Sequence, residues 1–117
     1  MMDITERREA VADLVQLRTS VDDAVSALRR FPWDCEDELV MLGPAELRHV
    51  LRAFLGGSLS ANQLENWANA VEGRDDVSFE PREMIDLVTE LANPLLFKPL
   101  STETAREMLQ RIDSLLM

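Results

Sequence analysis

The sequence predicts an all-α protein, a compact bundle of about five helices with a long N-terminal helix and a central antiparallel helix pair. Apolar residues recur at helical spacing through most of the chain, and prolines and glycines end each of these stretches. The length of 117 residues is enough for one sizeable hydrophobic core. We therefore expect a single helical domain spanning residues 1–117.

The first helix is predicted to run from Asp3 to Arg30. Asp3 and Glu6 have the spacing of a capping box, and Phe31 stands before a proline, which disfavours helical geometry. Apolar side chains form a heptad-like seam along this helix, which Arg7 and Arg18 interrupt: Ile4, Val11, Leu14, Val21, Val25 and Leu28. Any bend would fall at Thr19 and Ser20.

Two short segments have the composition of extended chain. The apolar run Leu39–Leu42 follows an acidic stretch, and Val77–Phe79 follows another. We expect these two segments to pair with each other across the core.

The central pair covers two amphipathic helices separated by a glycine turn. Pro44 suits the first position of the first helix, and Gly56 with Gly57 ends it. Ser60 and Gln63 form a capping box at the start of the second helix, which Gly73 ends. Two helices joined by so short a turn are expected to pack antiparallel.

Two further helices follow. Pro81 opens the first of them, and Asn93 with Pro94 ends it. The link from residue 93 to 100 carries apolar residues between two prolines and is expected to lie flat over the core: Leu95, Leu96 and Phe97. Ser101 caps the last helix, on which Glu107 and Arg111 form a pair at i, i+4 spacing.

The charge is strongly negative and uneven. The chain carries a net charge of −10, and residues 31–80 hold ten acidic residues and three arginines, which leaves −7 in the middle of the chain. Such a surface repels a phosphate backbone, so nucleic-acid binding is not expected. If the charge serves a partner, that partner is a basic protein that meets the middle segment.

The usual signals of catalysis and of metal binding are not found. With one cysteine, Cys35, and one histidine, His49, a single chain forms neither a disulfide nor a Cys/His zinc site. The acidic loop from Glu72 to Glu83 fails as a calcium loop because Val77 stands where the sharp turn requires glycine. We therefore predict no enzyme activity, no cofactor and no metal.

Neither a membrane span nor a signal peptide is predicted. No window approaches the roughly 20 uninterrupted apolar residues of a span, and the first ten residues lack the apolar stretch of a signal peptide. The sequence thus predicts a cytoplasmic protein.

The strongest candidates for partner contact surround one tryptophan. Trp33 falls outside the predicted helices beside an acidic run, which suits either a lid on the core or an interface anchor. The predicted contact surface combines this segment with a second acidic patch: Trp33, Asp34, Glu36, Asp37 and Glu38, with Asp75 and Asp76.

Two resemblances bear on function. The strings RFPWDCEDELVML, LRAFLGGSLSANQLENWANAVEGRDDVSFE and LVTELANPLL resemble a family of small, uncharacterised bacterial proteins. Over a shorter stretch, the order of amphipathic helix, glycine turn, Ser-capped helix and acidic bend is similar to all-helical bacteriocin immunity proteins of the colicin tRNase-inhibitor type. This second resemblance implies a small, acidic, cytosolic and non-catalytic protein that occludes a basic nuclease.

These observations leave three functional hypotheses. The first is a protein-interaction module, an immunity-like inhibitor of a basic partner. The second is a structural subunit that forms a homo-oligomer along the seam from Val11 to Leu28. The third is a small-molecule-binding domain with a pocket between its helices. Against all three, the acidity can serve simply as a solvated surface that keeps the protein soluble.

Overall fold

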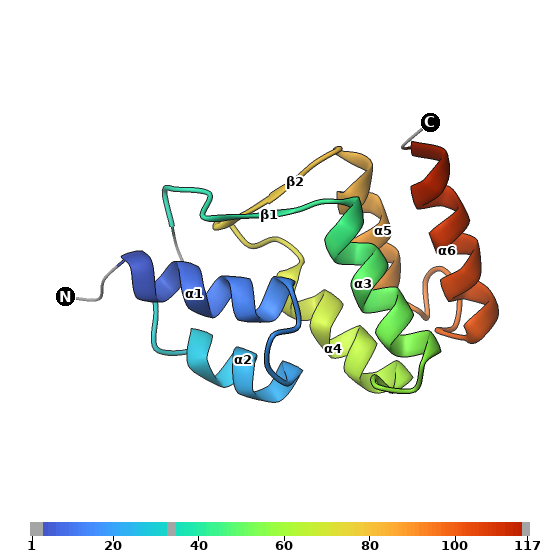
Figure 1. The fold of residues 1–117 in the computed structure, drawn as a ribbon, viewed down its shortest axis with the longest axis horizontal. Coiled ribbons are helices and arrows are strands. Elements are labelled where there is room, and N and C mark those ends of the chain that lie inside the picture. Colours follow the sequence, from blue (N-terminus) through green and yellow to red (C-terminus); the bar gives the residue numbers. More distant parts are fainter. Residues whose placement is uncertain (1–3, 33–34, 116–117) are drawn as a thin grey trace.

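The computed structural model describes residues 4–32 and 35–115, which form helices and a two-stranded parallel sheet (Figure 1). The elements follow the order α1 (Ile4–Val15), α2 (Val21–Leu28), β1 (Val40–Leu42), α3 (Pro44–Leu55), α4 (Ala61–Val71), β2 (Val77–Phe79), α5 (Glu83–Ala92) and α6 (Thr102–Leu115). Thus the described chain is mostly helical, with six helices where the sequence predicted about five. None of these helices is long and apolar enough to cross a membrane.

The prediction of one long N-terminal helix is wrong, because the chain breaks between α1 and α2. Leu17 takes a left-handed conformation with a φ of 53°, and the Ser20 hydroxyl accepts the backbone N–H of Asp23 at 3.1 Å to start α2. The break falls next to the predicted bend at Thr19 and Ser20. It lets α2 fold back onto α1, so that most of the predicted seam faces the core of its own chain, while Ile4 at its start is exposed.

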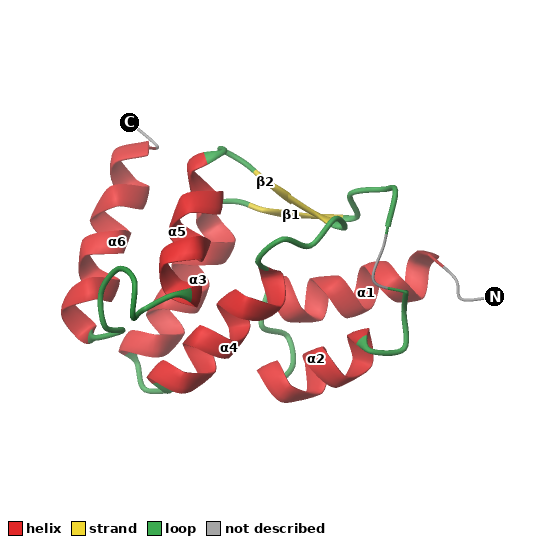
Figure 2. Cartoon of the chain, turned by 180° about the vertical axis from the view of Figure 1, so that it is seen from behind, coloured by secondary structure: helices red, strands yellow, loops and turns green. Residues whose placement is uncertain are grey.

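The predicted pairing of the two extended segments is confirmed. β1 and β2 run parallel, with Val40 opposite Val77 and Leu42 opposite Phe79 (Figures 1 and 2). The connection between parallel strands must return the chain to its starting edge, and α3 and α4 provide that crossover. As a result, the segments that precede the two strands meet at one end of the sheet.

The caps of the central helices form as predicted, while their packing differs. Ser60 and Gln63 complete the capping box at the start of α4, with bonds of 2.8 and 3.1 Å, and Gly57 turns the chain with a φ of 86°. The helix α4 packs mainly on α5, and α3 packs mainly on α6. The predicted antiparallel pair is therefore not confirmed as the central packing unit.

One hydrophobic cluster runs through the described chain, and Trp67 is its largest fully buried side chain. The indole Nε1–H of Trp67 donates to the Leu14 carbonyl of α1 at 2.8 Å. This bond satisfies the polar end of a buried aromatic ring and joins α4 to α1. Trp67 is thus a core residue.

The turn between α5 and α6 contradicts the expectation that it lies flat over the core. The backbone N–H groups of Leu96 and Phe97 both donate to the Asn93 carbonyl, which folds the segment into a tight turn. Leu95, Leu96 and Phe97 are consequently exposed by 101%, 79% and 51%. Three consecutive apolar side chains of this turn therefore face outward.

The predicted pair of Glu107 with Arg111 does not form. Arg111 binds Glu90 of α5 with two bonds of 3.1 and 2.8 Å, and Glu107 binds Lys98 of the preceding turn at 2.8 Å. The Arg111 guanidinium instead binds both carboxylate oxygens of Glu90 on the neighbouring helix, and such two-bond pairing is favoured over a single contact.

Candidate functional site

The parallel sheet brings the two predicted acidic segments together. The backbone N–H groups of Leu39 and Val40 both donate to the Asp76 carbonyl, at 2.8 and 3.2 Å. The chain just before β1 therefore lies against the chain just before β2, although the two are far apart in sequence. We call the exposed carboxylates of these two segments the acidic end: Glu36, Asp37, Glu38 and Asp75.

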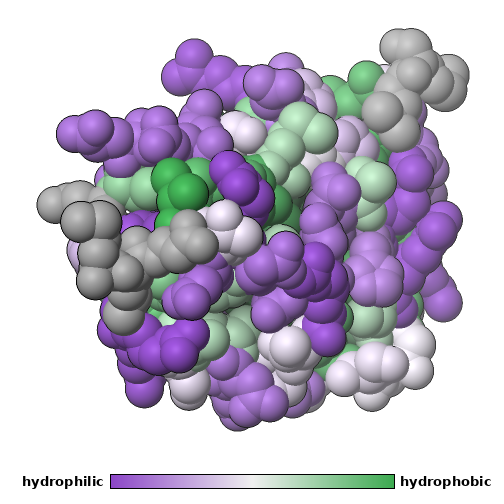
Figure 3. All heavy atoms as spheres, turned by 60° about the vertical axis from the view of Figure 1, so that its left-hand side comes forward, coloured by the Kyte–Doolittle hydropathy of each residue, from purple (hydrophilic) through white to green (hydrophobic). Residues whose placement is uncertain are grey.

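The side chains of the acidic end point into solvent. All four residues are exposed, and none forms an ion pair within the described part of the chain. Figure 3, which brings this side of the molecule forward, shows hydrophilic side chains around small apolar areas. Trp33 and Asp34, which were predicted to belong to the same surface, lie outside the described residues.

Asp76 does not belong to this surface, and its prediction as a contact residue is corrected. The residue is 1% exposed, and its carboxylate accepts the Arg7 Nε–H at 3.0 Å. Arg74 donates through Nε and Nη2 to the two carboxylate oxygens, at 2.8 and 3.0 Å. Asp76 is therefore committed to a buried ion cluster that ties α1 to the start of β2.

This cluster is arranged so that Asp76 stays ionised. Burial acts to raise the pKa of Asp76, but the hydrogen bonds and charges of Arg74 and Arg7 outweigh burial and hold the pKa below its ordinary value. The cluster carries two guanidinium groups for one carboxylate. The Nη2 of Arg7 is buried without a hydrogen-bond partner, and the guanidinium carbon lies 6.0 Å from the centre of the Phe31 ring.

Sequence reasoning missed this cluster because Arg7 and Asp76 are 69 residues apart. The signal that could have revealed it is Arg7 itself, a charged residue on the apolar seam of α1. A buried cation requires a buried counter-charge, so this interruption indicates a distant carboxylate. Nothing in the sequence identifies which carboxylate it is.

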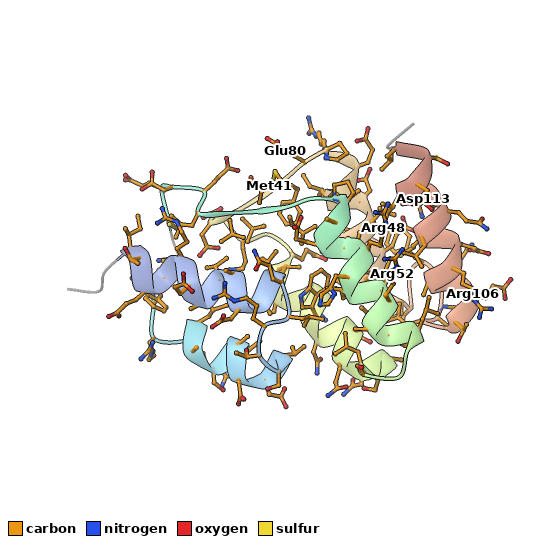
Figure 4. All side chains as sticks on the ribbon, in the orientation of Figure 1. Met41, Arg48, Arg52, Glu80, Arg106 and Asp113 are labelled. Carbon is orange, nitrogen blue, oxygen red and sulfur yellow. The ribbon has the colours of Figure 1, made fainter. Side chains whose placement is uncertain are left out.

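Basic side chains gather on a different part of the molecule. Figure 4 shows Arg48 and Arg52 on α3, on the side toward α6, which carries Arg106 and Asp113. Arg48 binds Asp113 at 2.7 Å, while Arg52 and Arg106 form no ion pair among the described residues. The surface charge is thus unevenly distributed, with unpaired acids at one end of the sheet and unpaired arginines on α3 and α6.

The two residues that most often carry chemistry are isolated from each other. Cys35 is half-buried and its thiol donates to the Asp37 carbonyl at 3.2 Å, which places it in the acidic segment. His49 is exposed on α3. The described residues hold no group of three or more His, Cys, Asp or Glu side chains arranged for a metal.

Comparison with protein-family models, with curated proteins and with solved structures found no match. Any functional interpretation therefore rests on the chain's own geometry and charge.

Proposed function

We propose that the protein is a non-catalytic interaction module whose acidic end binds a basic protein partner. The observation that carries this proposal is the parallel register of β1 and β2, which gathers unpaired, exposed carboxylates from two distant segments at one end of the sheet. These carboxylates remain available to a partner, because none of them forms an ion pair with a cation of the described chain.

The physical role of such a surface is mainly to accelerate association. Exposed charge pairs contribute little to affinity one by one, but a concentrated patch steers a partner of opposite sign and selects against partners of the same sign. Steering of this kind weakens as salt screens the charges. The proposed partner is a basic protein, and its binding is expected to be fastest at low ionic strength.

The resemblance to colicin tRNase-type immunity proteins supports a more specific form of the proposal. In that form the protein is an inhibitor that acts in the bacterial cytoplasm and covers the basic cleft of a nuclease. The acidic end then mimics the charge of the nuclease's own substrate, and the inhibitor needs no catalytic group.

A second candidate function is self-association through the exposed turn. The seam that was predicted to pair two copies is used inside the chain, where Val11 and Leu14 are fully buried. The turn offers a different surface, because Leu95, Leu96 and Phe97 are exposed side by side. Light scattering at two concentrations, with the Leu95→Ser, Leu96→Ser variant as control, tests whether two copies meet through this turn.

The interaction proposal is tested by capture from a lysate of the organism that encodes the protein, at low and at high salt. The test variant carries Glu36→Gln, Glu38→Gln and Asp75→Asn at the acidic end. Its matched control removes the same number of Glu and Asp charges from exposed positions elsewhere: Glu83→Gln, Asp86→Asn and Glu103→Gln.

We expect the wild type and the control variant to retain the same basic protein at low salt and to lose it at high salt. The acidic-end variant should retain much less of this protein than the wild type does at low salt. Equal retention by both variants would show that the acidic end is not the contact surface, and capture that persists at high salt would argue against an electrostatic mode.

A further inference from the structure

The helices α2 and α4 lie next to each other along one edge of the molecule (Figures 1 and 2). Side chains of both helices line a groove there. It consists of two hollows of about 520 and 390 Å³ that share four lining residues: Val25, Arg29, Asn69 and Ala70. The two hollows therefore adjoin each other along α2 and α4. Each is within the size range of small-molecule sites.

The smaller hollow has an apolar lining with a few polar groups. Val25, Leu28 and Ala70 come from the two helices, and Phe31 and Pro32 close the end of the hollow beyond α2. Ala70 matters because its small side chain leaves space that a larger residue would fill. Arg29, Asn69 and Arg74 are the polar members of the lining.

Guanidinium groups concentrate at this end of the groove. Arg29 and Arg74 line the hollow, while Arg7 and Arg30 lie 6.0 and 5.7 Å from the centre of the Phe31 ring that forms its wall. Two of the chain's twelve basic residues therefore line this hollow and two more lie near the aromatic ring in its wall, in a protein with 22 acidic residues.

The cations of this cluster are not fully neutralised by the described chain. Asp76 binds Arg74 and Arg7, and one nitrogen of Arg7 remains without a partner. Arg29 forms no ion pair among the described residues. The opposite end of the groove is different, since it carries Asp22 together with Ser26 and Asn66.

We propose that the groove between α2 and α4 binds a small organic anion, with its carboxylate against Arg29 and its apolar body on Val25, Leu28 and Phe31. A guanidinium binds a carboxylate through two parallel hydrogen bonds, and the apolar walls bury the rest of such a ligand. Asp22 at the far end repels the carboxylate and so sets the orientation. This ligand site uses none of the residues of the acidic end and does not depend on the proposed partner.

The test is a titration of the isotope-labelled full chain followed by backbone amide signals in nuclear magnetic resonance spectra. The probe is hydrocinnamate, a carboxylate on an aromatic body, and the matched ligand is its neutral amide, hydrocinnamamide. We expect hydrocinnamate to shift the signals of Val25, Arg29 and Asn69 in a saturable manner. The neutral amide should bind about tenfold more weakly, because it lacks the charge-assisted bonds.

Three variants make the test specific. Arg29→Gln removes the exposed cation and should weaken hydrocinnamate binding about tenfold, and Ala70→Leu should abolish it by filling the hollow. Arg52→Gln removes an exposed arginine from α3 and should change nothing. Arg29→Gln alters only a surface side chain, so it remains informative even if Ala70→Leu fails to fold.

The proposal is overturned if hydrocinnamate causes no saturable shift in the groove, or if the neutral amide binds equally well. It is also overturned if Arg29→Gln weakens binding no more than Arg52→Gln does.

Discussion

Asp75 and Asp76 are neighbours in sequence, yet they belong to two regions with opposite roles. Asp75 is exposed at the acidic end without an ion pair, while Asp76 is buried between Arg7 and Arg74. Both residues lie in the turn before β2, and only Asp76 is directed inward, where its carboxylate binds Arg7 and Arg74. The comparison shows that a count of negative charges describes neither stability nor binding until each carboxylate has been placed.

The difference has an energetic cause. A buried carboxylate requires counter-charges and becomes part of the fold, because removing one partner leaves the others uncompensated. An exposed carboxylate is hydrated and contributes little to stability, so it remains available for a partner. The acidic end and the buried ion cluster should therefore respond differently to the same substitution.

The largest effect is expected for Asp76→Asn. The substitution removes the charge that compensates the buried guanidinium of Arg7 and the partly buried one of Arg74, and we expect the free energy of unfolding to fall by about 3–5 kcal/mol. Urea unfolding followed by circular dichroism measures the change. A loss below about 1 kcal/mol is what an exposed ion pair gives. Such a small loss would contradict the conclusion that Asp76 belongs to a buried ion cluster.

Acid should weaken the wild type through the same carboxylate. The pKa of Asp76 is lower in the folded chain than its ordinary value of 3.8, so its contribution to stability is present above that value. This contribution is lost as the pH falls through the lower folded pKa. From pH 6 downward, the free energy of unfolding should fall less steeply with decreasing pH in Asp76→Asn than in the wild type. Identical slopes in the two proteins would contradict this linkage.

A smaller effect is expected where an ion pair lies at the surface. Arg48 and Asp113 join α3 to α6 at 2.7 Å, but the Asp113 side chain is 65% exposed. Asp113→Asn should lower the free energy of unfolding by about 1 kcal/mol or less. If this variant proved as unstable as Asp76→Asn, burial would not be what distinguishes the two pairs.

The smallest effect on stability is expected for Asp75→Asn. The residue is exposed and makes no ion pair in the described chain, so the free energy of unfolding should change by no more than about 0.5 kcal/mol. Measured beside Asp76→Asn by the same urea titration, it isolates the effect of burial between adjacent aspartates. A large loss would place Asp75 in the fold and remove it from the proposed contact surface.

The sequence predicted features that depend on local signals. The capping box of Ser60 with Gln63 formed as expected, because a cap involves residues only three positions apart. The pairing of Val40–Leu42 with Val77–Phe79 was also predicted, from two short apolar runs. It was this pairing that brought the acidic segments together.

Features set by distant contacts were missed or mispredicted. The break at Leu17 depends on α2 packing back onto α1, and the inward position of Asp76 depends on Arg7, which is 69 residues away. Leu95 and Leu96 are exposed, which apolar composition alone does not reveal. For the break and for Asp76, the deciding partner lies outside the local sequence window.

The most direct test of the acidic end is the association rate constant with the captured basic partner, measured by stopped-flow at several salt concentrations. The acidic-end variant should associate about tenfold more slowly than the wild type at low salt, and the two rates should converge as salt rises. The control variant should remain close to the wild type. Equal rates for the wild type and the acidic-end variant at low salt would contradict the account.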